Sequence, residues 1–238
     1  MKINIYSDIH GRYNTFLELK KNAPKAQKEF FVGDLIHRGR NSVKMLEYVL
    51  ENNSNVILGN HELLYLSYKG LRNKYLNNIS DDTINKSKKI YLSANFSLDK
   101  DLNESKKSKL FIDNVDNFFI NLPIEINIGK VRITHAPPSI ILNNHSSEKD
   151  IYTYMFHRPN PLMQIKDKFS IFGHNGNYSF WTWDNNLAIE KSMSLKNKGN
   201  LGECICIDSM KEYLSVITID VESLDYEINK IRGDKEWK

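Results

Sequence analysis

The sequence of 238 residues has only two cysteines and no long apolar run. Cys204 and Cys206 lie two residues apart in an expected strand, a spacing that does not favour a disulfide. A metal-binding Cys-x-Cys pair is one alternative, but buried free thiols in a reducing compartment are the expectation. No apolar stretch approaches the length that a membrane-spanning helix needs, so we expect no membrane partner.

The charge of the chain is nearly balanced and gives no strong hint of a partner. The 33 basic and 29 acidic residues leave a formal net charge of +4, too small to indicate nucleic-acid binding by itself. The first residues, MKINIYSD, lead directly into an expected strand, so we expect no secretory signal and a cytoplasmic protein. There is no repeat or linker, and the length fits one domain over residues 1–238.

Three polar blocks, each after a short apolar run, organise the N-terminal part of the chain. They are Ser7-Asp8-Ile9-His10-Gly11, Gly33-Asp34-Leu35-Ile36-His37-Arg38-Gly39 and Gly59-Asn60-His61-Glu62. Short apolar runs of this kind are typical of buried parallel strands, and open α/β sheets bind ligands outside the carboxyl ends of their strands. We therefore expect one edge of one sheet to carry Asp8, His10, Asp34, Asn60 and His61.

The residue types in these blocks are those that bind divalent ions. A carboxylate and an imidazole two residues apart, Asp8 and His10, suit Mn, Fe or Zn better than Ca or Mg. Asp34 has two oxygens and can bridge two ions, and Asn60 offers a neutral oxygen. Two further histidines end later apolar runs: His135 and His174. These six candidate ligands are enough for two ions with positions left open for water and substrate.

In type and order the blocks resemble the phosphoprotein phosphatase branch of the calcineurin-like metallophosphoesterases. That family carries GDxHG, GDxVDRG and GNHE, then an HG or HA block and a late GH block. Here they stand as SDIHG, GDLIHRG, GNHE, HAPP and FGHN. The resemblance spans Ile3 to about Asn175, and the compact length looks most like the phage and bacterial members. Two positions depart from the pattern: Ser7 replaces a glycine, and His37 replaces the Asp of DRG.

The resemblance implies an α/β fold, a two-sheet β-sandwich flanked by helices with a dinuclear metal site at the strand ends. It assigns the first ion to Asp8, His10 and Asp34. It assigns the second ion to Asp34, Asn60, His135 and His174. Mn is the expected metal, with Fe or Zn as alternatives, and a metal-bridging hydroxide is the expected nucleophile.

The resemblance also implies roles for residues outside the ligand set. His61 would protonate the leaving oxygen as general acid, and His37 stands where a carboxylate would orient that imidazole. Arg38 and Arg158 would bind the phosphate, with Asn60 as a further contact. Arg158 is chosen because it is the only arginine of its segment, and a surface ion pair is the alternative for it.

Periodicity predicts the remaining elements. Helices are expected over residues 13–22 and 111–122, and two more are expected to begin after Asn41 or Ser42 and at His61. A β-hairpin is expected in which 124–128 pairs with 131–134. Alternating residues near 203–207, 213–219 and 226–231 predict antiparallel strands of a second sheet. Residues from about 70 to 110 are rich in Lys, Asn and Ser and are expected to form a solvated, partly helical insertion. The alternative is a cap over the site that selects the substrate.

The expected function is hydrolysis of phosphoesters, with phosphoserine and phosphothreonine in proteins as the leading substrate class. The alternative is a dinucleoside polyphosphate hydrolase, or a nucleotide or RNA-end phosphatase. In that case the Lys-rich insertion and the aromatic residues near Trp181 would serve a nucleotide. A second alternative is a weakly active scaffold that binds phosphorylated partners, because His37 breaks the family pattern.

Overall fold

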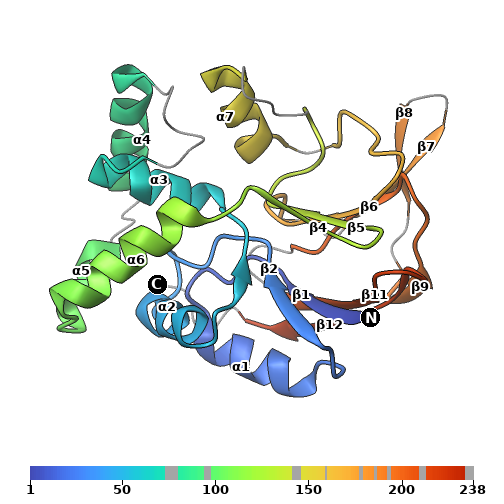
Figure 1. Cartoon of the computed structure of the whole chain (residues 1–238), viewed down its shortest axis with the longest axis horizontal. Helices are drawn as coiled ribbons and strands as arrows, with labels where there is room; N and C mark the ends of the chain where they lie inside the picture. Colours follow the sequence, from blue (N-terminus) through green and yellow to red (C-terminus); the bar gives the residue numbers. More distant parts are fainter. Residues whose placement is uncertain are drawn as a thin grey trace.

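Two mixed sheets of six strands pack face to face, and helices flank them (Figure 1). The computed structural model describes residues 1–72, 80–93, 98–140, 146–158, 160–176, 179–184, 187–191, 194–208 and 213–233. The expected sandwich with flanking helices is therefore confirmed. Among the described helices, none is both long and apolar enough to cross a membrane.

The first sheet has the strand order β3-β2-β1-β11-β12-β9. Its strands are β1 (Lys2–Tyr6), β2 (Lys28–Phe31), β3 (Asn55–Val56), β9 (Lys196–Lys198), β11 (Tyr213–Asp220) and β12 (Asp225–Arg232). The strands β1, β2 and β3 run parallel, as the three polar blocks predict. Their carboxyl ends therefore meet at one edge of the sheet, which is where those blocks begin.

The second sheet has the order β4-β5-β6-β10-β7-β8. Its strands are β4 (Glu125–Ile128), β5 (Val131–Thr134), β6 (Phe169–Phe172), β7 (Ser179–Asp184), β8 (Leu187–Lys191) and β10 (Cys204–Cys206). The expected β4–β5 hairpin is present. The strands β5 and β6 are parallel neighbours, so the histidines that follow them, His135 and His174, leave the sheet at the same edge.

The expectation that the last strands form an antiparallel second sheet is wrong in the sheet to which two of these strands belong. The strands β11 and β12 complete the first sheet, where β11 pairs antiparallel with β1 and aligns Ile219 with Ile3. The strand β10 joins the second sheet as expected, where it pairs antiparallel with β7 and parallel with β6. Six consecutive residues of β11 are buried, because this strand lies inside the first sheet and is covered on both faces.

The two faces of the first sheet bury different apolar clusters. Ile3 and Ile5 of β1 point into the sandwich, where they join Ile133 and Ile171 of the second sheet. Tyr6 points to the other face, in a cluster that also holds apolar side chains of the helices. Figure 1 shows α1 (Tyr13–Asn22) and α2 (Ser42–Glu51) on the lower side of the molecule. This alternation along β1 fixes which face each side chain takes.

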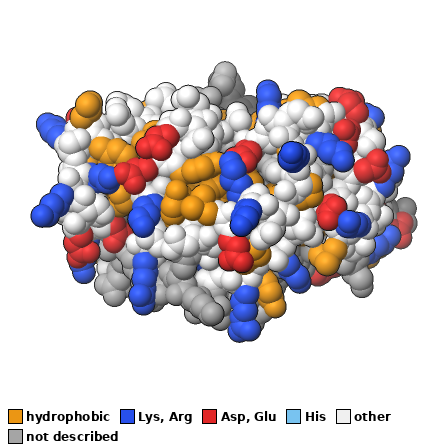
Figure 2. All heavy atoms as spheres, turned by 90° about the horizontal axis from the view of Figure 1, so that it is seen from below, with side chains coloured by type: hydrophobic (Ala, Val, Ile, Leu, Met, Phe, Trp, Pro, Cys, Tyr) orange, Lys and Arg blue, Asp and Glu red, His pale blue; other side chains and the backbone are white. Residues whose placement is uncertain are grey.

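The other helices lie along the upper and left sides of the molecule in Figure 1. They are α3 (Asn60–Lys69), α4 (Asp81–Ser93), α5 (Leu98–Glu104), α6 (Lys109–Asn121) and α7 (Glu148–Phe156). The helices α4 and α5 belong to the expected insertion, of which residues 73–79 and 94–97 lie outside the described part. Figure 2 shows the lower face, where basic and acidic side chains are interspersed, in keeping with the small net charge.

The two cysteines are free and buried, as expected. They share a small cluster with Phe172 and Trp181, whose rings stack with centroids 5.8 Å apart. Trp181 is therefore a packing residue, and a role in nucleotide binding for the aromatic residues near it stays a prediction. Tyr178, its neighbour in the sequence cluster of aromatic residues, lies outside the described residues.

Candidate active site

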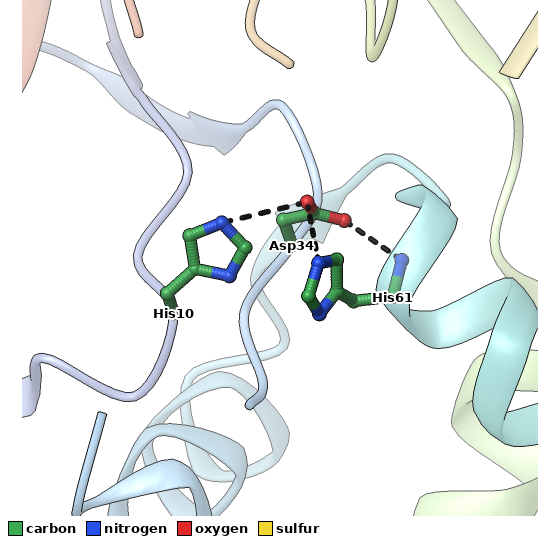
Figure 3. Close-up of side chains that lie close together, drawn as sticks. All are labelled: His10, Asp34 and His61. Atoms are coloured by element: carbon green, nitrogen blue, oxygen red, sulfur yellow. Dashed lines mark hydrogen bonds and ion pairs between the residues drawn. The ribbon is translucent and has the colours of Figure 1, made fainter. Parts of the chain in front are cut away.

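The Asp34 carboxylate is the centre of the site (Figure 3). His10 Nε2 lies 3.6 Å and His61 Nε2 3.8 Å from Asp34 Oδ2. The other oxygen, Oδ1, accepts the backbone N–H of His61 at 2.9 Å. The loops after β1 and β2 and the first turn of α3 therefore place these three side chains together, as the sequence predicts.

A second group of ligand types faces the other oxygen of the same carboxylate. His135 Nε2 lies 3.4 Å from Asp34 Oδ1, and His174 completes this trio. Asn60 Oδ1 lies 2.8 Å from His135 Nε2 and 2.9 Å from His174 Nδ1. Because each oxygen of Asp34 faces its own group, the carboxylate has the arrangement of a bridging ligand.

The tautomer of His135 shows that this arrangement fits a cation. The backbone oxygen of Val32 can only accept, so His135 Nδ1, at 2.8 Å, must carry the hydrogen. In the neutral ring Nε2 then has a lone pair, which points at the oxygen of Asn60 and towards Asp34. Several acceptor atoms that converge on one point repel one another unless a positive ion lies between them.

Asp8 reaches the centre from the end of β1 but belongs to neither trio. Its Oδ2 accepts the backbone N–H of His174 at 3.0 Å, while Oδ1 is buried and makes no hydrogen bond with the described residues. A Cβ at Gly173 would collide with Oδ1, so only glycine lets the chain pass so close. A buried carboxylate oxygen with no donor is costly without a cation, which fits the expected ligand role of Asp8.

Backbone strain is concentrated at the same residues. Five non-glycine residues of the site have a positive φ between 49° and 70°: His10, Asp34, His37, Arg38 and His174. Each such residue costs on the order of 1 kcal/mol or more, and strain of this kind gathers at functional sites. The loops are therefore held in shapes that serve the site rather than local backbone preference.

The two predicted arginines approach the two groups from outside. Arg38 Nη1 lies 3.3 Å from His10 Nε2, and Arg158 Nε donates to His174 Nε2 at 2.9 Å. Arg158 follows α7, and hydrogen bonds of Tyr154 hold this helix against the β4–β5 hairpin. The Tyr154 hydroxyl donates to the Glu125 carboxylate at 2.9 Å, and Arg132 donates to the same carboxylate and to the Tyr154 oxygen. Arg158 is thus directed at the centre by an anchored helix, and its guanidinium forms no ion pair with the residues that the structure describes.

His37 lies beside His61, where the resembled family has a carboxylate. The Nδ1 atoms of the two rings are 3.0 Å apart, so one of them donates to the other. Both side chains are buried. Burial, reinforced by the positive charge nearby, holds the pKa of His61 well below its usual value. The pair is therefore a hydrogen-bonded unit that brings no negative charge to His61.

A family comparison decides the class of the chain. The profile described as "Calcineurin-like phosphoesterase" matches residues 1–199. The chain belongs to this family. Membership in this family agrees with the two buried His/Asp trios, which form the dinuclear type of metal site that the sequence blocks predict.

Relatives of this calcineurin-like chain include two proteins named "Bis(5'-nucleosyl)-tetraphosphatase, symmetrical". One, from Buchnera aphidicola subsp. Acyrthosiphon pisum (strain 5A), is 28% identical over 165 residues, which are 64% of this chain and 57% of the relative. The other, from Buchnera aphidicola subsp. Schizaphis graminum, is 40% identical over 88 residues, 34% of this chain and 32% of the relative. The chain thus spans from about a third to just over half of the length of these relatives.

Solved structures share the fold at low sequence identity. A metallophosphoesterase from Sphaerobacter thermophilus matches with a TM-score of 0.59 at 12% identity, over 98% of this chain and 89% of that one. A candidate diadenosine tetraphosphatase matches with a TM-score of 0.54 at 17% identity, over 98% of this chain and 93% of that one. A protein serine/threonine phosphatase from Saccharomyces cerevisiae matches with a TM-score of 0.54 at 14% identity, over 98% of this chain and 80% of that one. The fold alone therefore does not separate these activities.

Two buried carboxylates of this calcineurin-like site have no role in the sequence analysis. Glu62 accepts backbone N–H groups of Asp34, Leu35 and Gly59 at 2.8–3.1 Å, which ties the Asp34 loop to the start of α3. Its position three residues after Gly59 is the spacing of a capping box, a signal that could have been used. Asp208, after β10, accepts the N–H of Gly176 at 2.8 Å. Its only sequence signal is an acid that ends an apolar run.

Burial and crowding make the carboxylates of the site poor acids. Burial raises the pKa of Asp34 to about 7. Burial also raises the pKa of Asp8 well above its usual value, with Asp208 and Asp34 adding to the effect. By contrast, burial lowers the pKa of His135 to about 4 and that of His174 to about 2. At neutral pH the histidines are ready to bind an ion, whereas the carboxylates must first lose protons.

Metal affinity should therefore weaken as the pH falls from about 8 to 6. An ion needs the carboxylate form, so binding near pH 7 displaces protons from Asp34 and Asp8, and affinity should change about tenfold per pH unit for each proton displaced. Calorimetric titration with Mn in two buffers of different protonation enthalpy measures both affinity and proton release. Affinity that is constant from pH 6 to 8, with no proton release, would contradict the assignment.

Proposed function

We propose that the chain hydrolyses phosphoanhydride bonds of dinucleoside polyphosphates, cleaving diadenosine tetraphosphate-like substrates between their phosphates. The observation that carries the proposal is the His37–His61 pair, 3.0 Å apart between Nδ1 atoms. The names of the relatives from Buchnera point the same way. The earlier leading substrate class, phosphoserine and phosphothreonine in proteins, becomes the alternative.

The acid strength that His61 can supply favours one class of leaving group. A carboxylate beside a general-acid imidazole stabilises the imidazolium form, which holds the proton that is donated. His37 brings no negative charge to His61, whichever of the two nitrogens carries the shared hydrogen. A serine or threonine alkoxide must be protonated to leave, but a nucleoside polyphosphate leaves as a stable anion. The site is therefore better suited to an anhydride than to an alkyl ester.

The residues have the following roles in this proposal. Two divalent ions, Mn being the leading candidate, would supply Lewis acidity and an activated water when bound. The first ion would take Asp8, His10 and Asp34. The second would take Asp34, Asn60, His135 and His174. Arg38 and Arg158 would each bind oxygens of the phosphoryl group that is attacked, where guanidinium groups stabilise the charge that develops.

Glu62 and Asp208 act through the residues that they hold. Glu62 keeps Asp34 in its strained conformation by accepting the N–H of Asp34 and of Leu35. Asp208 holds the loop after His174 through Gly176 and adds negative charge beside Asp8. That charge would strengthen the attraction for two cations, because carboxylates near a metal centre raise its affinity even when they do not bind the metal.

A direct comparison of substrates tests the proposal. With Mn added, we expect kcat/KM for diadenosine tetraphosphate to exceed that for a phosphoserine peptide by at least about 100-fold, or ~2.7 kcal/mol. Chromatography of the products identifies the bond that is cut, and symmetrical cleavage would give nucleoside diphosphate only. Equal values, or a preference for the peptide, would restore the protein phosphatase alternative.

Replacing His37 by Asp should change the leaving-group preference. The new carboxylate would stabilise protonated His61, so turnover of alkyl phosphates should rise about tenfold, part of the 10²–10⁴-fold that general acids contribute. Turnover of diadenosine tetraphosphate should change little. His37→Asn is the matched control, because its amide forms a hydrogen bond without a charge and should not raise alkyl phosphate turnover. If His37→Asp lowers the rates on both substrates, His37 has a positive role of its own.

A further inference from the structure

One side chain of the inserted segment reaches the catalytic histidine pair. Tyr91 lies on α4 and is 2% exposed. Its ring packs edge to face against His37, with centroids 5.1 Å apart and planes at 73°. His37 in turn meets His61 through the Nδ1 atoms. The insertion is therefore in contact with the site, although the lysines that mark it in the sequence are not the residues that make this contact.

Tyr91 is itself fixed by two neighbouring segments. Its ring stacks on Tyr68 of α3, with centroids 4.5 Å apart and planes at 13°. Its hydroxyl oxygen accepts the N–H of Leu98, the first residue of α5, at 3.1 Å. Leu98 and Leu102 of α5 are buried in the core cluster that also contains helix α2 residues. The ring of Tyr91 is thus held by α3 and α5 and gives His37 a firm neighbour.

The direction of the His37–His61 hydrogen bond follows from the surroundings of His61. Two ring nitrogens 3.0 Å apart share one hydrogen between them. The other nitrogen of His61, Nε2, lies 3.8 Å from Asp34 Oδ2. A hydrogen on Nε2 is attracted to that oxygen, whereas a lone pair there would be repelled by it. His61 is therefore better placed with its hydrogen on Nε2, and its Nδ1 then accepts from His37.

We propose that His37 donates Nδ1–H to His61 and so holds His61 as the Nε2–H tautomer, with Tyr91 as the positioning residue that keeps the ring of His37 in place. A carboxylate has two oxygens and tolerates rotation, but an imidazole offers one nitrogen in one plane. The replacement of the family carboxylate by His37 therefore requires a neighbour that fixes the ring. The insertion supplies this neighbour, which gives it a role other than covering the substrate.

The inference rests on the proposed place of His61 next to the leaving group, but its test does not depend on turnover. Nitrogen-15 NMR of the histidine rings in the zinc-loaded and metal-free chain reports which nitrogen carries each hydrogen. We expect the hydrogen of His61 on Nε2 in the wild type, and on Nδ1 in His37→Asp, because a carboxylate can only accept. Signals are assigned with His37→Gln and His61→Gln. Finding the hydrogen of His61 on Nδ1 in the wild type would overturn the proposal.

Two substitutions of Tyr91 test the positioning role. Tyr91→Leu removes the ring and should mix the tautomers of His61, whereas Tyr91→Phe keeps the ring and should retain the wild-type spectrum. In a series of aryl phosphates, Tyr91→Leu should slow the poorest leaving group about tenfold and the best less than threefold, because leaving groups differ in their need for a donor. A purely structural defect would slow all members equally.

Ile228→Ala on β12 is the control for a general loss of stability. Ile228 is buried in the cluster inside the sandwich, which does not contain Tyr91, so this variant should lower the unfolding temperature and leave the leaving-group series and the spectrum unchanged. If Tyr91→Leu gives the wild-type spectrum and slows all aryl phosphates equally, Tyr91 is not a positioning residue. If the chain turns over no phosphoester but the spectra behave as expected, the proposed function fails and this inference stands.

Discussion

Asp34→Asn should abolish turnover and the tight binding of two ions. The amide keeps an oxygen for the N–H of His61, but it loses the charge and the second ligand atom that face the two groups. We expect turnover to fall on the order of 10³-fold or more, which corresponds to at least ~4 kcal/mol of transition-state stabilisation. Elemental analysis of the purified chain and steady-state rates measure the two effects.

A carboxylate away from the site provides the control for this variant. Asp220 accepts from the N-terminal amino group at 2.9 Å, and Asp220→Asn should keep full metal content and rate.

Unfolding of the metal-free Asp34→Asn protein separates chemistry from folding. Burial raises the pKa of Asp34 to about 7, so above that pH the ionised group costs folding free energy. At pH 8 the metal-free variant should therefore be at least as stable as the metal-free wild type. Two tightly bound ions and a normal rate in Asp34→Asn would remove the bridging assignment.

Arg158→Ala should cause the second-largest loss of activity. The guanidinium is directed at the centre by its hydrogen bond to His174 and by the anchored helix α7. Removal of one preorganised donor should cost about 2–4 kcal/mol of transition-state stabilisation, which lowers kcat/KM by roughly 30- to 1000-fold. Arg158→Lys should recover only part of the loss, because an ammonium lacks the planar fork that matches two phosphate oxygens.

The measurement for Arg158 should include inhibition by inorganic phosphate. Loss of a phosphate contact weakens this inhibition along with catalysis, whereas general damage to the site affects metal content too. Arg232→Ala, an exposed arginine at the end of β12, is the matched control and should behave like the wild type. If Arg158→Ala matches the wild type on every phosphoester, the second phosphate contact lies elsewhere.

The sequence predicts that the ligand-type side chains gather at one place, because its signals are local. Each polar block follows an apolar run, and parallel strands bring their carboxyl ends to one edge whatever the rest of the chain does. The place of β11 could not be predicted in this way. Its alternating residues fit either sheet, and only the pairing of Ile219 with Ile3, residues far apart in the chain, decides between them. Local periodicity contains no information on such long-range pairing.

The residues that support the site were harder to find than the ligands. Asp208 is one acidic residue after a short apolar run, and without a spacing motif it resembles many surface residues. Tyr91 lies in a polar, Lys-rich segment whose composition indicates a solvated insertion. Its contact with His37 depends on how α4 packs against α3, which is a property of the tertiary structure. Composition therefore predicted the character of the insertion but not the residue that links it to the site.

The central claim is that two ions, bound together by one bridging carboxylate, make this site active. A titration of the metal-free chain with Mn, in which bound metal and hydrolysis of diadenosine tetraphosphate are followed in the same sample, tests it most directly. We expect little activity when one equivalent of Mn has been added, and a steep rise in activity as the second ion is bound. Full activity with one bound ion per chain, or activity that persists after complete removal of metal, would contradict it.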